Sequence, residues 1–126
     1  MKQVISTANA PSALGPYSQA VEAGGFVYVS GQLGLDPQTM ELAGESAKDQ
    51  AQTALGNVQH ILEAAGLAMD DAVMVTVLLN SISDYAEVNE VYASFFSEPY
   101  PARAVYEVGA LPKSAAIEIM VIAVRK

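Results

Sequence analysis

Two charged residues stand in apolar, strand-like parts of the sequence, where charge is unusual. Arg103 lies in the run 101–106, and Glu118 is the only charged residue from Ala116 to Val124. Charged side chains are rare in such surroundings unless they are paired, bind a metal or belong to a functional site. A guanidinium presents a planar fork of donors that matches a carboxylate, so Arg103 suggests a small carboxylate ligand.

A purely structural role also explains these two residues. Arg103 and Glu118 could bridge each other, or one of them could bridge a carboxylate at the rim, and so hold two strands in register. Structural ion pairs and active sites perturb charged groups in similar ways, so both interpretations stay open at this point.

Composition limits the class of protein. The 126 residues are 52% hydrophobic with a mean hydropathy of +0.26, which predicts a single folded domain over residues 1–126. The net charge is -8, with only six Lys and Arg residues, and this opposes binding to phosphate-rich partners. We therefore expect no nucleic-acid partner and no membrane partner.

Metal and thiol chemistry find little support in the sequence. No cysteine is present, and His60 is the only histidine, on a helix with no acid four residues later. We expect no metal site built on cysteine or histidine, and a packing or surface role for His60. The N-terminus lacks the apolar core of a signal peptide, which predicts a cytoplasmic protein.

The first half of the chain predicts a hairpin followed by a helix. Segments 17–22 and 26–31 are expected to pair through the turn Gly24-Gly25, with a loop over residues 33–44. Apolar residues recur at helical spacing from Ser46 to Ala65, with Ser46 as N-cap and Gly66 just after the C-terminus.

The second half predicts a strand, a helix and two more strands. The strand covers residues 73–79, and the helix is capped at Asp84, carries an apolar stripe from Tyr85 to Phe96 and ends before Pro99. The last strands cover residues 102–108 and 116–124. The resulting order is ββαβαββ, an α+β fold with a mixed sheet and two helices packed on one face.

The strands at 73–79 and 116–124 are apolar on both faces, yet two helices can cover only one face of the sheet. Another subunit is the simplest source of cover for the other face. An oligomer would also place strand residues such as Arg103 and Glu118 near a subunit boundary, where clefts commonly form.

Several motifs together resemble the RidA/YjgF family. They extend from near the first strand to the C-terminus, and the most specific is the block from Pro-Ala-Arg to Ile-Glu-Ile. The motifs are Gly15-Pro16-Tyr17-Ser18-Gln19-Ala20, Val27 to Gln32, Asn57 to Gly66, Val88-Asn89 to Phe96, Pro101-Ala102-Arg103, Leu111-Pro112 and Ile117-Glu118-Ile119.

The resemblance implies a chorismate-mutase-like subunit that forms a homotrimer with three inter-subunit clefts. It also implies an enzyme without metal or cofactor that hydrolyses enamines and imines, such as 2-aminoacrylate or related 2-imino acids, to 2-oxo acids and ammonia. By position, Arg103 would hold the substrate carboxylate, Glu118 would orient or activate water, and Tyr17 would reach in from the N-terminal hairpin.

The same resemblance places further residues at the pocket. Ser30, Gly31 and the backbone at Val105 would form its walls, and Asn89 would lie close by. Val105 stands where several relatives have cysteine, so any thiol chemistry of relatives cannot apply here. Met120 stands where relatives often have an acid, which makes the surroundings of the pocket less acidic.

Two other functions stay open. A non-catalytic trimer that binds 2-oxo acids would use Arg103 in the same way without turnover. An endoribonuclease or translation inhibitor, a description attached to some relatives, is disfavoured by the net charge of -8 and the lack of a basic stripe.

Overall fold

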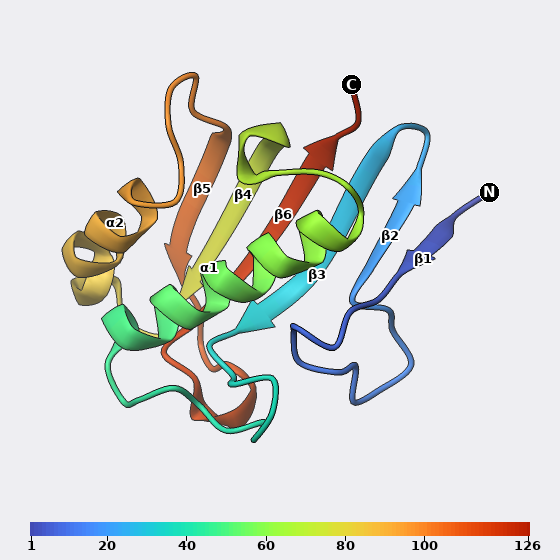
Figure 1. The fold of residues 1–126 in the computed structure, drawn as a ribbon. Helices are drawn as coiled ribbons and strands as arrows, with labels where there is room; N and C mark the ends of the chain where they lie inside the picture. The colour runs from blue at the N-terminus through green and yellow to red at the C-terminus, as the bar shows by residue number, and fades with distance from the viewer.

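The structure is a computed structural model that describes all residues, 1–126. Six strands form one sheet in the order β1-β2-β3-β6-β4-β5. Only β4 and β5 pair in parallel, and the other neighbours are antiparallel. Both helices lie on one face of this sheet (Figure 1), so the expected α+β fold with a mixed sheet is confirmed. The elements are β1 Gln3–Ile5, β2 Ala20–Ala23, β3 Phe26–Leu33, α1 Ala47–Ala64, β4 Ala72–Leu79, α2 Tyr85–Ala93, β5 Ala102–Glu107 and β6 Ile117–Val124.

Helix α1 follows the sequence prediction closely. The Ser46 side chain accepts a hydrogen bond from the Asp49 amide and caps the first turn. At the other end Gly66 has φ of 78°, and the Leu67 amide donates to the Leu62 carbonyl, as in a Schellman motif. The apolar stripe of α1 is fully buried on the sheet, so packing and caps define the same helix.

The N-terminal part differs from the prediction. The first strand of the hairpin begins at Ala20, because Tyr17, Ser18 and Gln19 lie in a loop. A short strand that the sequence analysis missed, β1, pairs with β2 at the edge of the sheet. The order is therefore βββαβαββ rather than ββαβαββ. Three half-exposed residues at a sheet edge give too weak a pattern to read from sequence.

The second helix is shorter than expected. A turn of 3-10 helix, Ile82–Asp84, leads into α2, and the Asp84 side chain makes no capping hydrogen bond. The helix ends at Ala93, so Phe95 and Phe96 of the predicted stripe lie beyond it. Phe96 is nevertheless buried, so it packs in the core without belonging to the helix.

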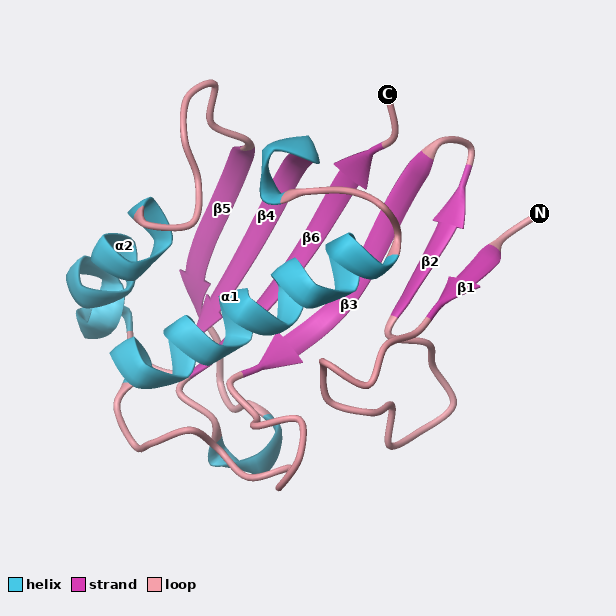
Figure 2. Ribbon diagram, in the orientation of Figure 1, coloured by secondary structure: helices cyan, strands magenta, loops and turns pink.

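The two faces of the sheet differ in burial. Residues that point toward the helices, such as Val75 and Ile119, are 0% exposed, whereas Tyr28 and Met120 on the other face are 44% and 37% exposed. Strands β4 and β6 are thus covered on one face only within this chain. Figure 2 shows the same layering, with helices α1 and α2 on the near side of the sheet. No helix is long and apolar enough to cross a membrane.

Candidate active site

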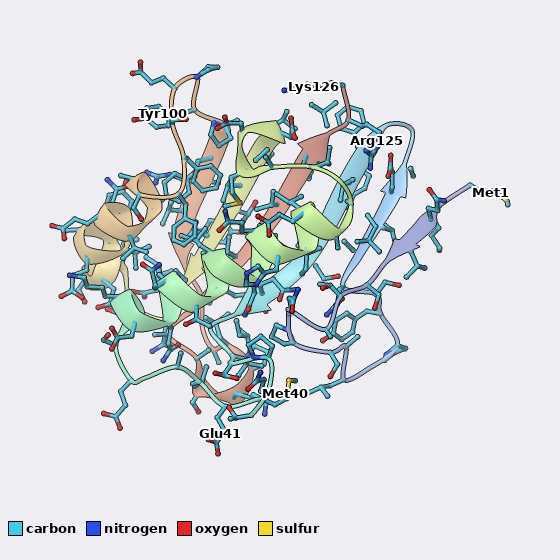
Figure 3. The ribbon with its side chains drawn as sticks, viewed as in Figure 1. Met1, Met40, Glu41, Tyr100, Arg125 and Lys126 are labelled. Carbon is cyan, nitrogen blue, oxygen red and sulfur yellow. The ribbon has the colours of Figure 1, made fainter.

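A cavity of about 340 Å³ opens at the end of the sheet where β3 ends and β6 begins. Its walls come from the segment before β2, the end of β3, the following loop and the turn before β6. Met40, one of its lining residues, marks this end of the molecule in Figure 3. The full lining is Pro11, Ser12, Leu14, Gly15, Pro16, Tyr17, Gln19, Gly31, Gln32, Leu33, Leu35, Met40, Pro112, Lys113 and Glu118.

A β-bulge brings Gly31 against Glu118 in this cavity. Val29 pairs with Val121 and Gln32 with Ile119, so one extra residue is inserted in β3 at this point. A Cβ atom on Gly31 would lie 2.7 Å from Cδ of Glu118, closer than real contacts allow. A side chain at position 31 would therefore push the Glu118 carboxyl group out of its present position.

The Glu118 side chain is half-buried. Its carboxyl group makes no hydrogen bond and no ion pair within the chain. Burial raises the pKa of Glu118 above the ordinary value of 4.5. A guanidinium beside Glu118 would lower this pKa, but Arg103 does not lie there, so desolvation decides the direction.

Tyr17 and Ser30 have different positions relative to the cavity. Tyr17 lines it and is 53% exposed, so its phenol group is accessible. Ser30 is not a lining residue, and its hydroxyl donates to the Ser18 carbonyl at 2.6 Å. The structure thus brings Tyr17, Gly31 and Glu118 together, while Ser30 ties β3 to the loop that carries Tyr17.

Buried polar side chains that the sequence analysis did not single out hold the cavity walls. Gln19 exchanges hydrogen bonds with the backbone of Thr7, Ala10 and Pro11, and Asn57 on α1 donates to the carbonyls of Leu33 and Leu35. Asn57 stands on the apolar face of a strongly periodic helix, which is a signal that could have been read. Gln19 lies in no periodic element, so its burial carried no signal.

Lys113 was also missed. It is the only cation that lines the cavity, in a turn where its φ is 58°, a conformation uncommon for residues other than glycine. Its ammonium group forms no salt bridge, so Glu118 and Lys113 share the cavity without pairing.

Arg103 lies elsewhere, against helix α2. Its Nη1 donates to Oδ1 of Asn89 at 2.7 Å, and its Nη2 donates to the hydroxyl of Tyr85 at 2.8 Å. The guanidinium also lies over the Tyr92 ring, 4.6 Å from the centroid. All these partners are neutral, so the charge of Arg103 is not compensated within the chain.

Arg103 and Glu118 point to opposite faces of the sheet. Arg103 is the register partner of Val75, which faces the helices, and Glu118 is the register partner of Leu78, on the other face. They are also offset by three residues, about 10 Å, along the strands. The hypothesis that they bridge each other is wrong for the single chain, and neither pairs with a rim carboxylate or another cation.

The remaining predicted pocket residues lie with Arg103. Asn89 contacts it directly, and Val105 follows two positions later on the same face of β5, where it packs against the core. The candidate residues therefore form two groups, one around Arg103 and one around Glu118. No cluster of three or more His, Asp or Glu side chains is placed to hold a metal ion.

The group around Arg103 and the group around Glu118 can each do a different kind of chemistry. An uncompensated, oriented guanidinium binds an anion, and a carboxylate is the best geometric match. A carboxyl group whose pKa is raised by burial holds a proton more tightly than an exposed one and can act as a general acid and base. Together they would suit a carboxylate substrate that exchanges protons with water.

A protein-family model described as Endoribonuclease L-PSP matches residues 7–125. Among curated proteins, the human 2-iminobutanoate/2-iminopropanoate deaminase is 46% identical over 99% of this chain and 91% of its own length. Among solved structures, RidA from the Antarctic bacterium Psychrobacter sp. PAMC 21119 is 51% identical with a TM-score of 0.93, over 97% of this chain and 98% of that one. Escherichia coli TdcF, solved with bound serine, is 43% identical with a TM-score of 0.93, over 98% of this chain and 99% of that one.

Proposed function

This chain belongs to the Endoribonuclease L-PSP family, the RidA/YjgF family that its motifs resembled, and we propose that it hydrolyses 2-imino acids to 2-oxo acids and ammonia. The 2-imino acids would include the imine form of 2-aminoacrylate. One observation carries the proposal: Arg103 and Glu118, the two charges in apolar strands, have no oppositely charged partner in the chain. Their partners are then expected to be substrate, water and protons rather than each other.

The proposed reaction needs only positioning and proton transfer. Arg103 holds the substrate carboxylate, and water adds to the carbon of the C=N bond to give a carbinolamine. Glu118 accepts a proton from the attacking water and delivers it to the imine nitrogen. It then accepts the hydroxyl proton of the carbinolamine and passes it to the amine, so that the C=O bond forms as the C–N bond breaks and ammonia leaves. Proton transfer by such a group contributes about 10²–10⁴-fold in rate, and orientation adds several kcal/mol, up to about 7.

We also propose that the complete site forms between subunits of a homotrimer. Within one chain Arg103 and Glu118 lie on opposite faces of the sheet, so one small substrate cannot reach both. A neighbouring chain packed on the open sheet face would bring its Arg103 to the Glu118 cavity. The apolar residues of that face, which form a shallow hollow, support this assembly; they include Tyr28, Met74, Met120 and Ile122.

The test is the hydrolysis of 2-aminoacrylate released in place by a serine dehydratase. We expect the wild-type protein to accelerate formation of the 2-oxo acid and Arg103→Ala to lose this acceleration while remaining folded and assembled. Full activity in Arg103→Ala would show that the carboxylate anchor lies elsewhere.

A second candidate is a trimer that binds small carboxylates without turnover. The solved structure of a relative with bound serine favours it, because serine carries a carboxylate and is not an imine. Binding of a 2-oxo acid that depends on Arg103, without any acceleration of hydrolysis, would support this candidate. Ribonuclease activity, which the family description names, is disfavoured because the chain carries a net charge of -8.

A further inference from the structure

Helix α2 presents three side chains to Arg103 from one of its faces. Tyr85, Asn89 and Tyr92 follow each other at intervals of four and three residues, so they line up along the helix. Tyr85 and Asn89 each accept a hydrogen bond from a different Nη atom of Arg103, and Tyr92 lies under the guanidinium. Two hydrogen bonds and the contact with the Tyr92 ring thus fix the plane of the Arg103 guanidinium.

None of these contacts neutralises the guanidinium. An Asp or Glu in place of Asn89 would orient Arg103 equally well, but its carboxylate would also neutralise the guanidinium. The amide and the phenol orient the fork and leave the charge for another group. They also leave other N–H donors of the guanidinium unused.

The Tyr85 hydroxyl has a free donor as well. It accepts the hydrogen of Arg103 Nη2 at 2.8 Å, and it donates to no group in the chain. A phenol that accepts a charge-assisted bond is polarised toward donating its own hydrogen. Tyr85 is 41% exposed, so a ligand at the guanidinium can reach this hydrogen.

We infer that Tyr85 is a second binding residue for the substrate carboxylate, donating its O–H beside the Arg103 fork, and that Asn89 is a positioning residue that orients Arg103 without neutralising it. The inference rests on the proposed function for the identity of the ligand, a 2-imino or 2-oxo acid. It adds a specificity element to the site, because a guanidinium cation and an O–H donor side by side favour an anionic carboxylate over a neutral amide or ester.

The experiment measures binding of 2-oxobutanoate by calorimetry and, separately, kcat and KM for imine hydrolysis. We expect Tyr85→Phe to weaken 2-oxobutanoate binding and raise KM about tenfold, which corresponds to about 1.4 kcal/mol, with kcat within about threefold of wild type. Tyr100→Phe is the matched control, because Tyr100 is 60% exposed in the loop before β5 (Figure 3) and forms no side-chain hydrogen bond. Equal binding by Tyr85→Phe and Tyr100→Phe would overturn the role of Tyr85.

Two substitutions of Asn89 separate the effect of its shape from the effect of a negative charge at this position. Asn89→Asp keeps the shape and the acceptor but pairs with Arg103, so we expect binding to fall about 100-fold or more. Asn89→Ala loses the contact but keeps the charge free, so a fall of only about tenfold is expected. An Asn89→Asp variant that binds as well as Asn89→Ala, or better, would overturn the role of Asn89.

Binding and turnover separate this inference from the proposed function. A wild-type protein that binds 2-oxobutanoate but hydrolyses no imine would refute the proposed function, while the pattern among the α2 variants would still support the inference. Wild-type hydrolysis with α2 variants that bind like wild type would refute the inference alone. Thermal unfolding of each variant identifies any loss of binding that comes from a loss of fold.

Discussion

Burial disfavours the ionised form of Glu118. Its pKa is raised above 4.5 by burial, so the folded protein holds this proton more tightly than the unfolded chain does. The ionised carboxylate therefore costs stability. This cost is absent below about pH 4.5 and grows as the pH rises through the raised pKa.

Glu118→Gln should consequently stabilise the protein at neutral pH and inactivate it. We expect a melting temperature higher by roughly 1–3 °C at pH 7, modest because solvent still reaches the carboxyl group, and no gain near pH 4. The value of kcat should fall about 100-fold or more, with weaker effects on 2-oxo acid binding. Thermal unfolding at both pH values checks the first point, and a destabilised variant at pH 7 would assign Glu118 a structural role.

Gly31 and Glu118 should be energetically coupled. Gly31→Ala places a methyl group 2.7 Å from Cδ of Glu118, near the flexible end of that side chain, so we expect the carboxyl group to move, with a loss of about 1 kcal/mol in unfolding free energy and a clear loss of turnover. In a Glu118→Ala background the three atoms that clash are gone, and the same substitution should cost little. Chemical denaturation of the four proteins measures the coupling, and additive effects would contradict the clash.

For single residues, the sequence showed which side chains were unusual but not which groups they contact in the folded chain. Arg103 and Glu118 stood out because charge is rare in apolar strands, and both do lack a structural counter-ion. Their separation could not be predicted, since it depends on strand order and register, which join residues far apart in the chain. Tyr85 was placed in an apolar stripe because its spacing is helical, and spacing says nothing about its hydroxyl.

Among the helices and strands, too, some features could be predicted from the sequence and others could not. Helix α1 was predicted almost to the residue, since its caps and its apolar period agree. The bulge in β3 was not predicted, although it sets the position of Gly31. A bulge exists only relative to the partner strand, here β6, and the sequence of β3 alone does not reveal it.

The loop before β2 depends on one buried side chain for its shape. Gln19 is 5% exposed and makes four hydrogen bonds to backbone atoms of residues 7–11. Gln19→Ala should lower the unfolding free energy by about 1–3 kcal/mol, because it leaves buried carbonyl groups without donors. We expect faster hydrogen exchange at the Thr7 amide, which loses its acceptor. The exposed Gln38→Ala, whose side chain makes no hydrogen bond, is the control, and equal exchange in both variants would contradict this role.

At the scale of the whole molecule, the two helices cover one face of the sheet and leave the other open, as the sequence predicted. Strands that looked apolar on both sides are covered by helices on one side only, and the uncovered side is partly exposed in the single chain. An uncovered apolar sheet face predicts an oligomer, and the number of subunits stays a proposal. The cytoplasmic location expected from the sequence also stays a prediction.

The placement of Arg103 and Glu118 makes a prediction about assembled subunits. If each site takes Arg103 from one chain and Glu118 from its neighbour, Arg103→Ala and Glu118→Gln are each inactive alone but complement each other when mixed. After unfolding and refolding an equal mixture, about a quarter of the sites receive an intact Arg103 and an intact Glu118, because each site draws its two chains at random. Imine hydrolysis at about a quarter of the wild-type rate is therefore expected, against almost none before mixing. A mixture that refolds into assemblies of wild-type size yet stays inactive would mean that each chain builds its own site, and Arg103 would then have to reach Glu118 by a rearrangement across the sheet.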